Sequence, residues 1–323
     1  MSQESVKTFV KAFVFPGQGS QAVGMGKALA EAFASARAVF AEVDEALHEK
    51  LTELMFTGPE AELTLTANAQ PALMAVSMAA LRVLETEAGL DLARDAAFVA
   101  GHSLGEYSAL AAAGSFSVAE AAKLLRLRGK AMQAAAPVGA GAMAALLGID
   151  VEAAHDIARR AAEEAGGVCA VANDNGGGQV VVSGATAAVN RAIDLAKAAG
   201  ARRSVLLPVS APFHCSLMQP AAEAMAAALE TVEIRPPSAP LVANVLAAEV
   251  TDPDEIRRLL VAQATAPVRW RESLIFMADK GVTVFIECGA GKVLAGLVKR
   301  VCPAASGISI GTPEDIPLYK ALG

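Results

Sequence analysis

The chain has 323 residues and a formal net charge of −7, and 54% of its residues are hydrophobic but only 4% aromatic. Alanine is the commonest residue, so this composition indicates closely packed helices rather than a membrane protein. The longest uncharged stretches, 64–81 and 132–149, are interrupted by proline or glycine and lack the roughly 20 continuous apolar residues of a spanning helix. The acidic balance without a Lys/Arg block argues against nucleic-acid binding.

The cysteines and histidines give no sign of a metal site or of disulfides. The four cysteines have no CxxC spacing, and the four histidines form neither an HExxH pattern nor a His-Cys cluster. Residues 1–13 lack the apolar core and small-residue cleavage site of a signal peptide. We therefore expect a cytoplasmic protein that holds no metal.

The first part of the chain predicts alternating strands and helices. Residues 8–15 (TFVKAFVF) predict a short buried strand that ends at Pro16, and 31–51 predict an amphipathic helix. Residues 97–100 predict a second strand, which runs into a glycine-rich turn and then a helix that ends near Gly114. This order indicates an α/β fold.

The stretch 142–209 has an order of its own. It predicts strand, helix, strand, strand, helix and strand, which is the ferredoxin-like order βαββαβ. These elements are expected at 142–149, 151–165, 168–171, 179–182, 187–199 and 204–209. The chain then returns to α/β, with helices at 217–230, 254–263, 270–280 and 291–300 and strands at 241–245 and 282–286. We expect a discontinuous large domain, residues 1–137 and 209–323, that carries a small domain, residues 138–208.

A serine motif lies between a predicted strand and a predicted helix. Gly101-His102-Ser103-Leu104-Gly105 fits G-x-S-x-G, in which a nucleophilic serine lies on a sharp strand-to-helix turn. The neighbours two positions away must lack bulk, and the N–H of Leu104 at the helix start points toward a developing oxyanion. The alternative is a glycine-rich turn with a capping serine.

A serine nucleophile needs a base, and the sequence offers four histidines. His102 is adjacent to the serine in the chain and is expected to point elsewhere, while His48 and His155 lie on helices that we expect to be solvated. His214, in the loop 210–215, is the best candidate, although a core histidine held by backbone would fit the same pattern. Cys215 is a poorer nucleophile candidate than Ser103, because adjacent side chains rarely face each other.

One arginine falls on the apolar face of a predicted helix. Ser117 and Glu120 form a capping box for a helix that runs to about Ala136. At about 3.6 residues per turn, Arg128 shares a face with Leu124, Leu125 and Met132. The opposite face carries Lys123, Arg126, Lys130 and Gln133. A buried guanidinium is costly unless paired, so Arg128 indicates either an internal salt bridge or a receptor for a carboxylate substrate.

Two glycine-rich segments imitate phosphate-binding loops. The segment 17–22 fits G-x-G-x-x-A, but Pro16 precedes it and no second strand ending in an acid follows, which argues against a dinucleotide site. The segment 289–292 lacks the first glycine and the Ser/Thr of a Walker motif, and a tight turn that opens a helix explains it better.

Together these residues resemble the malonyl-CoA:acyl carrier protein transacylases. The matching segments are collinear and span nearly the whole chain. They are FPGQGSQ (15–21), GHSLGE (101–106), RGKAMQ (128–133), Asn173-x-Asn175 with GQVVVSG (178–184), PFHC (212–215), Gln263 with PVRW (267–270), and GAGKVLAGL (289–297). The resemblance implies an α/β-hydrolase-like large domain with an inserted ferredoxin-like small domain.

The resemblance also implies roles for single residues. Ser103 would be the acylated nucleophile, His214 its general base, and Arg128 the partner of the malonyl carboxylate. The backbone N–H groups of Gln18 and Leu104 would form the oxyanion hole. A backbone carbonyl near Gln263, rather than an Asp, would hold the histidine. Phe213 before the histidine and Leu104 after the serine match the pattern of malonyl-preferring members. The remaining supporting residues would be Met132, Asn173 and Asn175.

The reaction implied is a ping-pong transfer of malonyl from malonyl-CoA to acyl carrier protein for fatty acid synthesis. CoA and phosphopantetheine enter as substrates, and we expect no other cofactor, no nucleic-acid or membrane partner, and a monomer. Because carrier proteins are acidic, docking needs a basic patch, for which the candidates are Arg202, Arg203, Lys292, Lys299 and Arg300. A serine esterase or thioesterase with the same Ser-His pair is the alternative, and a silent carrier-docking protein is a more distant one.

Overall fold

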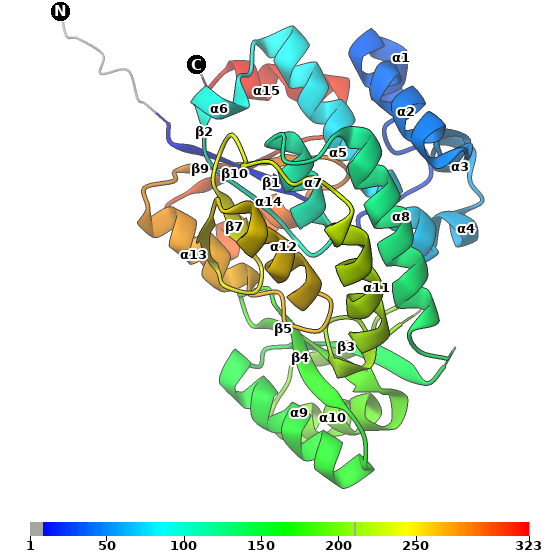
Figure 1. Cartoon of the computed structure of the whole chain (residues 1–323). Helices are drawn as coiled ribbons and strands as arrows, with labels where there is room; N and C mark the ends of the chain where they lie inside the picture. Colours follow the sequence, from blue (N-terminus) through cyan, green and yellow to red (C-terminus); the bar gives the residue numbers. More distant parts are fainter. Residues whose placement is uncertain (1–8, 138, 210, 323) are drawn as a thin grey trace, which may run out of the picture.

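The computed structural model describes residues 9–137, 139–209 and 211–322. Its larger sheet has six strands in the order β10-β9-β1-β2-β7-β8, and every neighbouring pair is parallel except β7 and β8 (Figure 1). The strands are β1 (Lys11–Phe15), β2 (Ala96–Gly101), β7 (Leu241–Ala243), β8 (Ala248–Val250), β9 (Val284–Cys288) and β10 (Ser306–Ile310).

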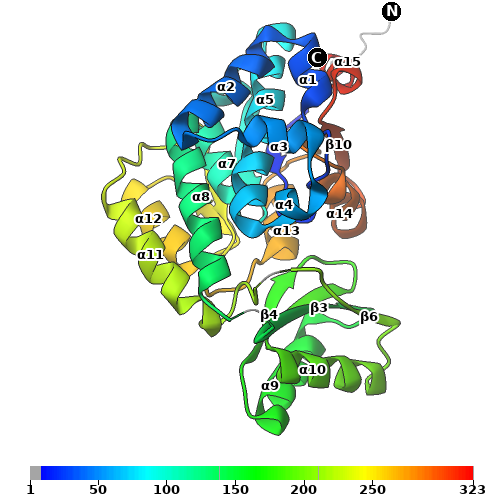
Figure 2. The same ribbon diagram turned by 90° about the vertical axis from the view of Figure 1, so that its right-hand side faces the viewer.

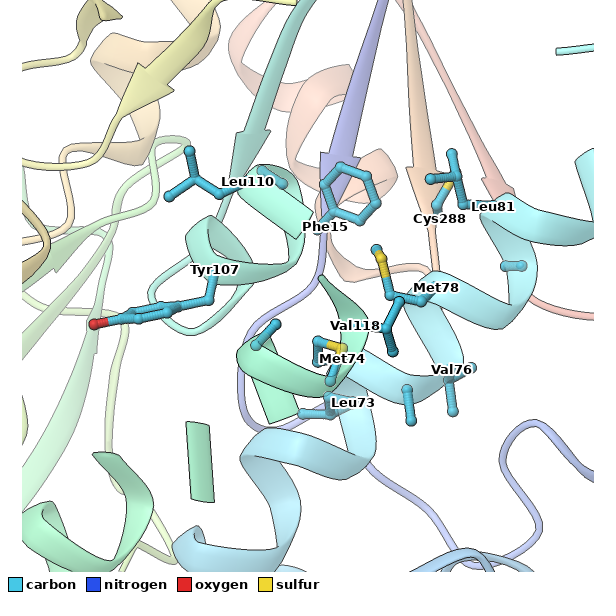
Figure 3. Packing of buried hydrophobic residues seen from close by; sticks show 14 of the residues in the cluster. Phe15, Leu73, Met74, Val76, Met78, Leu81, Tyr107, Leu110, Val118 and Cys288 are labelled. Atoms are coloured by element: carbon cyan, nitrogen blue, oxygen red, sulfur yellow. The ribbon is translucent and has the colours of Figure 1, made fainter. Parts of the chain in front are cut away.

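Helices cover both faces of this sheet, which explains why residues 12–15 of β1, near the middle of the sheet, are all apolar. Phe13 and Phe15 of β1 pack into one cluster with helices α2, α5, α7 and α8, while Ala12 and Val14 pack on the other face with α13 and α14. Figure 3 shows Phe15 beside α5 and α7 in the first cluster. The helices are α1 (Lys27–Ala32), α2 (Ala34–Leu47), α3 (Leu51–Thr57), α4 (Glu60–Thr64), α5 (Thr66–Ala88), α6 (Leu92–Asp95), α7 (Gly105–Ala112), α8 (Val118–Ala134), α11 (Gln219–Glu230), α12 (Pro253–Ala262), α13 (Trp270–Asp279), α14 (Val293–Val301) and α15 (Ile316–Lys320).

The part of the chain that follows α8 and precedes α11 forms a second, four-stranded antiparallel sheet, with strand order β4-β5-β3-β6 (Figure 2). Its elements are β3 (Gly141–Leu147), α9 (Val151–Ala165), β4 (Cys169–Asp174), β5 (Gln179–Ala185), α10 (Thr186–Ala198) and β6 (Arg203–Leu206). Alternate residues of β3 face opposite ways. Ala144 and Leu146 pack against α9 and α10, while Met143 and Ala145 join Met132 and Phe213 in a cluster on the other face.

The α/β class and the ferredoxin-like insert expected from the sequence are confirmed. The capping box of Ser117 and Glu120 is present, and the helix expected at 151–165 begins after Asp150, whose side chain accepts the N–H of Ala153. The division into 1–137 with 209–323 and 138–208 stays a prediction. The single helix expected at 31–51 is wrong: extended Phe33 separates α1 from α2, and His48, with φ 52°, ends α2. No helix in the described ranges has the length and apolarity to cross a membrane.

Strand β4 is longer than the sequence indicated. It was expected to end at residue 171 but continues to Asp174, past a register shift against β5. Its last residue contacts α13 and the segment before it: the N–H of Asp174 donates to Val268 O (3.0 Å), and Arg271 Nε of α13 donates to the carboxylate of Asp174 (2.7 Å). The two sheets are thus joined along this strand, beside the serine motif.

Candidate active site

Ser103 lies at a strained turn between β2 and α7, as the G-x-S-x-G pattern predicts. Its φ is 53°, in the left-handed region that residues with a side chain rarely adopt. The flanking glycines are sterically required. A Cβ on Gly101 would lie 1.9 Å from the carbonyl of Gly105, and one on Gly105 would lie 2.2 Å from Phe15 O. The capping-serine alternative does not explain this crowding.

His214 is the histidine that reaches the serine. Its Nε2 lies 2.8 Å from Ser103 Oγ, and its side chain is buried. Its Nδ1 lies 2.9 Å from Gln263 O and 3.2 Å from Ala266 O. Since both partners of Nδ1 are carbonyl oxygens, Nδ1 carries the proton and Nε2 is free to accept the serine proton. The backbone carbonyl expected near Gln263 is therefore present.

The electrostatics of the site keep this histidine neutral. Burial, and secondarily the positive charge of Arg128, lowers the pKa of His214 to about 3. A neutral imidazole at physiological pH is the form that can take a proton from the hydroxyl. The site thus holds a neutral imidazole beside the serine hydroxyl, with no carboxylate partner on Nδ1.

Arg128 projects inward, as its helical face predicts, and is 1% exposed. Its Nη1 donates to Gln70 Oε1 (2.8 Å), and its Nη2 donates to Gln263 Oε1 (2.8 Å) and to Ser103 Oγ (3.2 Å). The guanidinium also lies 5.6 Å from the ring centroid of Tyr107. Among the residues that the structure describes, no salt bridge joins Arg128 to a carboxylate, so the internal salt bridge is the wrong alternative.

Two residues that line the same cavity as Ser103 have backbone N–H groups that are free of partners among the described residues. Leu104 is the N-cap of helix α7, and Gln18 lies in the loop after β1, where Gly17 packs closely against the carbonyl of His102. Within the described part of the chain, neither the N–H of Leu104 nor that of Gln18 donates to a protein acceptor. Such free donors at a helix start are suited to an oxyanion.

These groups line a cavity of about 720 Å³ that lies between the two sheets. Ser103, His214 and Arg128 lie in it together with the predicted Gln18, Leu104, Met132, Asn173 and Phe213. Gln263 and Asn175 are not part of the lining but contact residues that are: Gln263 binds Arg128, and Asn175 Oδ1 lies 2.9 Å from His102 Nε2. The residues that the sequence indicated therefore either line this cavity or contact a residue that lines it.

The other candidate nucleophile and bases are placed elsewhere. His48 and His155 are exposed, as expected, and His102 packs beside Trp270 with ring centroids 5.6 Å apart. Cys215 is buried and its Sγ donates to Pro212 O (3.2 Å). The five basic docking candidates, Arg202, Arg203, Lys292, Lys299 and Arg300, are all exposed.

Arg126, which the sequence places on the face of α8 opposite Arg128, is buried as well. Arg126 is 7% exposed, because the N-terminus of α5 lies over it. Its guanidinium donates to Ala67 O (2.5 Å), to the side chain of Asn68 and to Glu49 Oε2 (2.5 Å). A helical wheel that locates one buried face cannot show a second neighbouring helix.

Three buried polar residues of the site were missed. Gln70 lies within an apolar run of α5, Glu106 follows the serine motif, and Asn244 follows β7; each is at most 1% exposed. Gln70 binds Arg128, and Glu106 Oε2 accepts the N–H of Asn244 (2.7 Å). Burial raises the pKa of Glu106 to about 7. For Gln70 and Asn244, the one signal in the sequence was the presence of a polar residue between apolar neighbours; for Glu106, it was the position directly after the serine motif.

Comparison with known proteins gives a consistent result. The profile of the family described as "Acyl transferase domain" matches residues 12–312. The chain is 47% identical to the malonyl CoA-acyl carrier protein transacylase of Bacillus subtilis (strain 168), over 95% of each chain. It is 44% identical to the protein of the same name from Escherichia coli (strain K12), over 94% of this chain and 96% of that one.

Solved structures agree with the sequence comparison. An acyl-carrier-protein S-malonyltransferase from Bartonella henselae superposes with a TM-score of 0.94 at 55% identity, over 97% of this chain and 99% of that one. A malonyl-transacylase solved in complex with a type II polyketide synthase acyl-carrier protein superposes with a TM-score of 0.93 at 41% identity, over 97% of this chain and 100% of that one. The chain belongs to the malonyl-CoA:acyl carrier protein transacylase family.

Proposed function

We propose that this chain transfers a malonyl group from malonyl-CoA to the phosphopantetheine thiol of acyl carrier protein, through a malonyl ester of Ser103. The observation that carries this proposal is the buried guanidinium of Arg128, bound only to neutral groups, 3.2 Å from the serine hydroxyl. A cation held beside a nucleophile in a cavity suits an acyl group that ends in a carboxylate.

In the first half-reaction, His214 Nε2 takes the hydroxyl proton as Ser103 Oγ attacks the thioester carbonyl of malonyl-CoA. The N–H groups of Leu104 and Gln18 stabilise the resulting oxyanion. The tetrahedral intermediate collapses, the C–S bond breaks, and His214 returns the proton to the leaving CoA thiolate. The products are the malonyl ester of Ser103 and free CoA.

In the second half-reaction, the phosphopantetheine thiol replaces CoA in the cavity. His214 takes the thiol proton as sulfur attacks the ester carbonyl, and the same two N–H groups hold the oxyanion. The C–O bond then breaks and the proton passes to Ser103 Oγ. The enzyme is regenerated without any other cofactor, and the described residues contain no cluster of His, Cys, Asp and Glu that could hold a metal ion.

Arg128 anchors the malonyl carboxylate throughout both steps. Gln70 and Gln263 each hold one of its terminal nitrogens, which fixes the plane of the guanidinium without neutralising its charge. Charge-assisted hydrogen bonds of this kind contribute about 1.5–3 kcal/mol each. Phe213 and Leu104 line the cavity beside it and would limit the size of the acyl group.

The acyl group that becomes attached to Ser103 tests this proposal. Incubation with an equimolar mixture of acetyl-, malonyl- and methylmalonyl-CoA, followed by denaturation and peptide mass analysis, should show malonyl on Ser103. Ser103→Ala should carry no label. An unlabelled wild-type serine, or acetyl as the main adduct, would contradict the proposal.

A serine esterase or thioesterase with the same Ser-His pair is the competing function. It requires water to reach the acyl-serine efficiently, and it gains nothing from a cation bound beside the serine. The ratio of thiol transfer to hydrolysis, measured with and without a pantetheine acceptor, distinguishes the two activities. We expect transfer to dominate, whereas an acceptor-independent rate would favour the hydrolase.

Recognition of the carrier protein is proposed to use exposed basic residues near the turn 176–178. Arg300 of α14 packs its aliphatic stem over Gly177, and Lys299 is exposed beside it. Single replacement of Lys292, Lys299, Arg300, Arg202 or Arg203 should weaken the second half-reaction and reduce its salt dependence, while acylation by malonyl-CoA stays unchanged.

We further propose that the protein is a monomer, that it works in the cytoplasm, and that its product supplies fatty acid synthesis.

A further inference from the structure

The hydrogen-bond ladder between β2 and β7 stops beside the serine turn. The two strands are parallel, and the N–H of Val99 donates to Pro240 O (2.9 Å). A parallel ladder repeats every two residues. Continued toward the turn, it would join the N–H of Asn244 to Gly101 O and the N–H of Ser103 to Asn244 O.

The side chain of Asn244 makes these two bonds in place of its backbone. Its Nδ2 donates to Gly101 O (2.7 Å), and its Oδ1 accepts the N–H of Ser103 (2.8 Å). Its backbone groups are bound elsewhere, the N–H to Glu106 Oε2 (2.7 Å) and the carbonyl to the N–H of Arg269 (3.1 Å). The side-chain amide of Asn244 thus takes the place of a backbone amide at the end of the ladder.

Because the side chain of Asn244 makes the bonds that its backbone would make, the chain can leave the sheet at the serine. Ser103 adopts its φ of 53° while its N–H stays bound to Asn244 and its carbonyl accepts from Gln263 Nε2 (3.0 Å). We propose that Asn244 is a positioning residue, whose carboxamide holds the strained serine turn so that the hydroxyl stays in reach of His214. The proposal relies on Ser103 being the nucleophile.

The geometry requires a group that donates and accepts at once. A carboxamide and a protonated carboxyl meet this requirement, whereas an aliphatic side chain makes neither bond and an ionised carboxylate cannot donate to Gly101 O. Asn244 is fully buried, so water does not replace a lost partner at low cost. The side chain at position 244 should therefore decide the reactivity of the serine.

The first test uses Asn244→Leu and phenylmethylsulfonyl fluoride, a serine reagent that has no carboxylate and needs no acyl-CoA. A displacement of about 1 Å costs on the order of 10²-fold in rate, so we expect inactivation of Asn244→Leu to be slower by about that factor. In the Ser103→Ala background, the dissociation constant of malonyl-CoA should be unchanged by Asn244→Leu, because Asn244 makes no hydrogen bond to Arg128 and Gln70 still holds the guanidinium. Wild-type inactivation shows separately whether Ser103 is a nucleophile.

Asn68→Ala is the matched control. Asn68 also donates to one backbone carbonyl, Glu62 O (2.8 Å), and accepts from Arg126, but it lies outside the cavity. Its replacement should lower the melting temperature without changing the inactivation rate. A wild-type inactivation rate in Asn244→Leu, or a loss no larger than that of the control, would overturn the proposal.

Asn244→Asp provides a second test through pH. At about pH 5, where a buried carboxyl remains protonated, this variant should react faster than Asn244→Leu, and its advantage should shrink as the carboxyl ionises. Equal rates at that pH would show that the hydrogen bonds do not matter. Two residues with ionisable side chains bind the backbone of Asn244 directly, Glu106 of α7 through its carboxylate and Arg269, just before α13, through its N–H. Three further ionisable groups lie one residue away: Arg128 of α8 binds Gln263, His214 binds Ser103, and His102 stands between Gly101 and Ser103 in the chain.

Discussion

Arg128 donates a hydrogen bond to the hydroxyl of Ser103 across 3.2 Å. The guanidinium therefore contacts the nucleophile itself as well as the space that an acyl chain must occupy. A substrate carboxylate that binds Arg128 is held at a fixed distance from the attacking oxygen. In the proposed reaction, selection of the acyl group and alignment of the thioester carbonyl would therefore be coupled through one side chain.

Arg128→Ala should separate malonyl from acetyl transfer. Loss of the carboxylate contact removes about 1.5–3 kcal/mol, so malonyl transfer should fall by about 10-fold to 100-fold while acetyl transfer is spared or improved. Rates of Ser103 acylation with the two acyl-CoAs measure this ratio.

Arg126→Ala is the control on the same helix, because Arg126 is also buried but binds Glu49 and the start of α5. It should lower stability and leave the malonyl-to-acetyl ratio as in the wild type. If Arg128→Ala reduces both activities equally, Arg128 does not anchor the carboxylate.

The sequence predicted the parts of the site that follow from a local pattern. Ser103 was found from its flanking glycines and Arg128 from its helical face, because sterics and periodicity act over a few neighbouring residues. Asn244 could not be found in this way, since its partners Gly101 and Ser103 lie 143 and 141 residues away along the chain. The burial of Arg126 could not be predicted for a related reason: it depends on Ala67 and Asn68, which only the folded chain brings over α8.

The acylation rate should stay constant across the range in which a solvent-exposed histidine titrates. The pKa of His214 is lowered to about 3, so the base remains deprotonated as pH falls through 6.5, its ordinary value, and is lost only as pH approaches 3. Single-turnover acylation of Ser103 at a series of pH values measures this. A rate that halves near pH 6.5 would contradict the neutral, buried base.

The contribution of Arg128 to this shift can be measured separately. Arg128→Met removes the positive charge but keeps an apolar side chain of similar length, so the pKa of His214 should rise and the acidic limb of the rate should move upward. Acylation by acetyl-CoA is the suitable reaction, since it does not need the carboxylate anchor. Burial is the larger cause of the shift, so the limb should remain below pH 6.5.

Glu106 should make the folded state less stable as pH rises. Burial raises the pKa of its carboxyl from 4.5 to about 7, so between these values the folded chain keeps a proton that the unfolded chain releases. The free energy of unfolding should therefore fall from pH 4.5 to 7, by about 3 kcal/mol from this group.

The variant Glu106→Gln tests this prediction, because its side chain cannot titrate but its amide oxygen can still accept the N–H of Asn244. The wild type minus variant difference in urea unfolding should change with pH, and a constant difference would show that Glu106 does not titrate in this range.

The glycine before the serine turn should tolerate no side chain at all. A Cβ on Gly101 would lie 1.9 Å from backbone atoms of Gly105, so neither a rotamer change nor a small side-chain shift relieves the contact. We expect Gly101→Ala to destabilise the protein by at least the roughly 1–3 kcal/mol of an overpacked site and to abolish acylation of Ser103.

Gly296→Ala is the matched control, since Gly296 lies within α14 and no atom beyond its own stretch of helix stands within 4 Å of its added Cβ. Because alanine is favoured over glycine by about 1 kcal/mol inside a helix, this control should be as stable as the wild type or more so. Thermal unfolding and labelling of both variants test the steric argument, and a folded, reactive Gly101→Ala would show that the turn can relax.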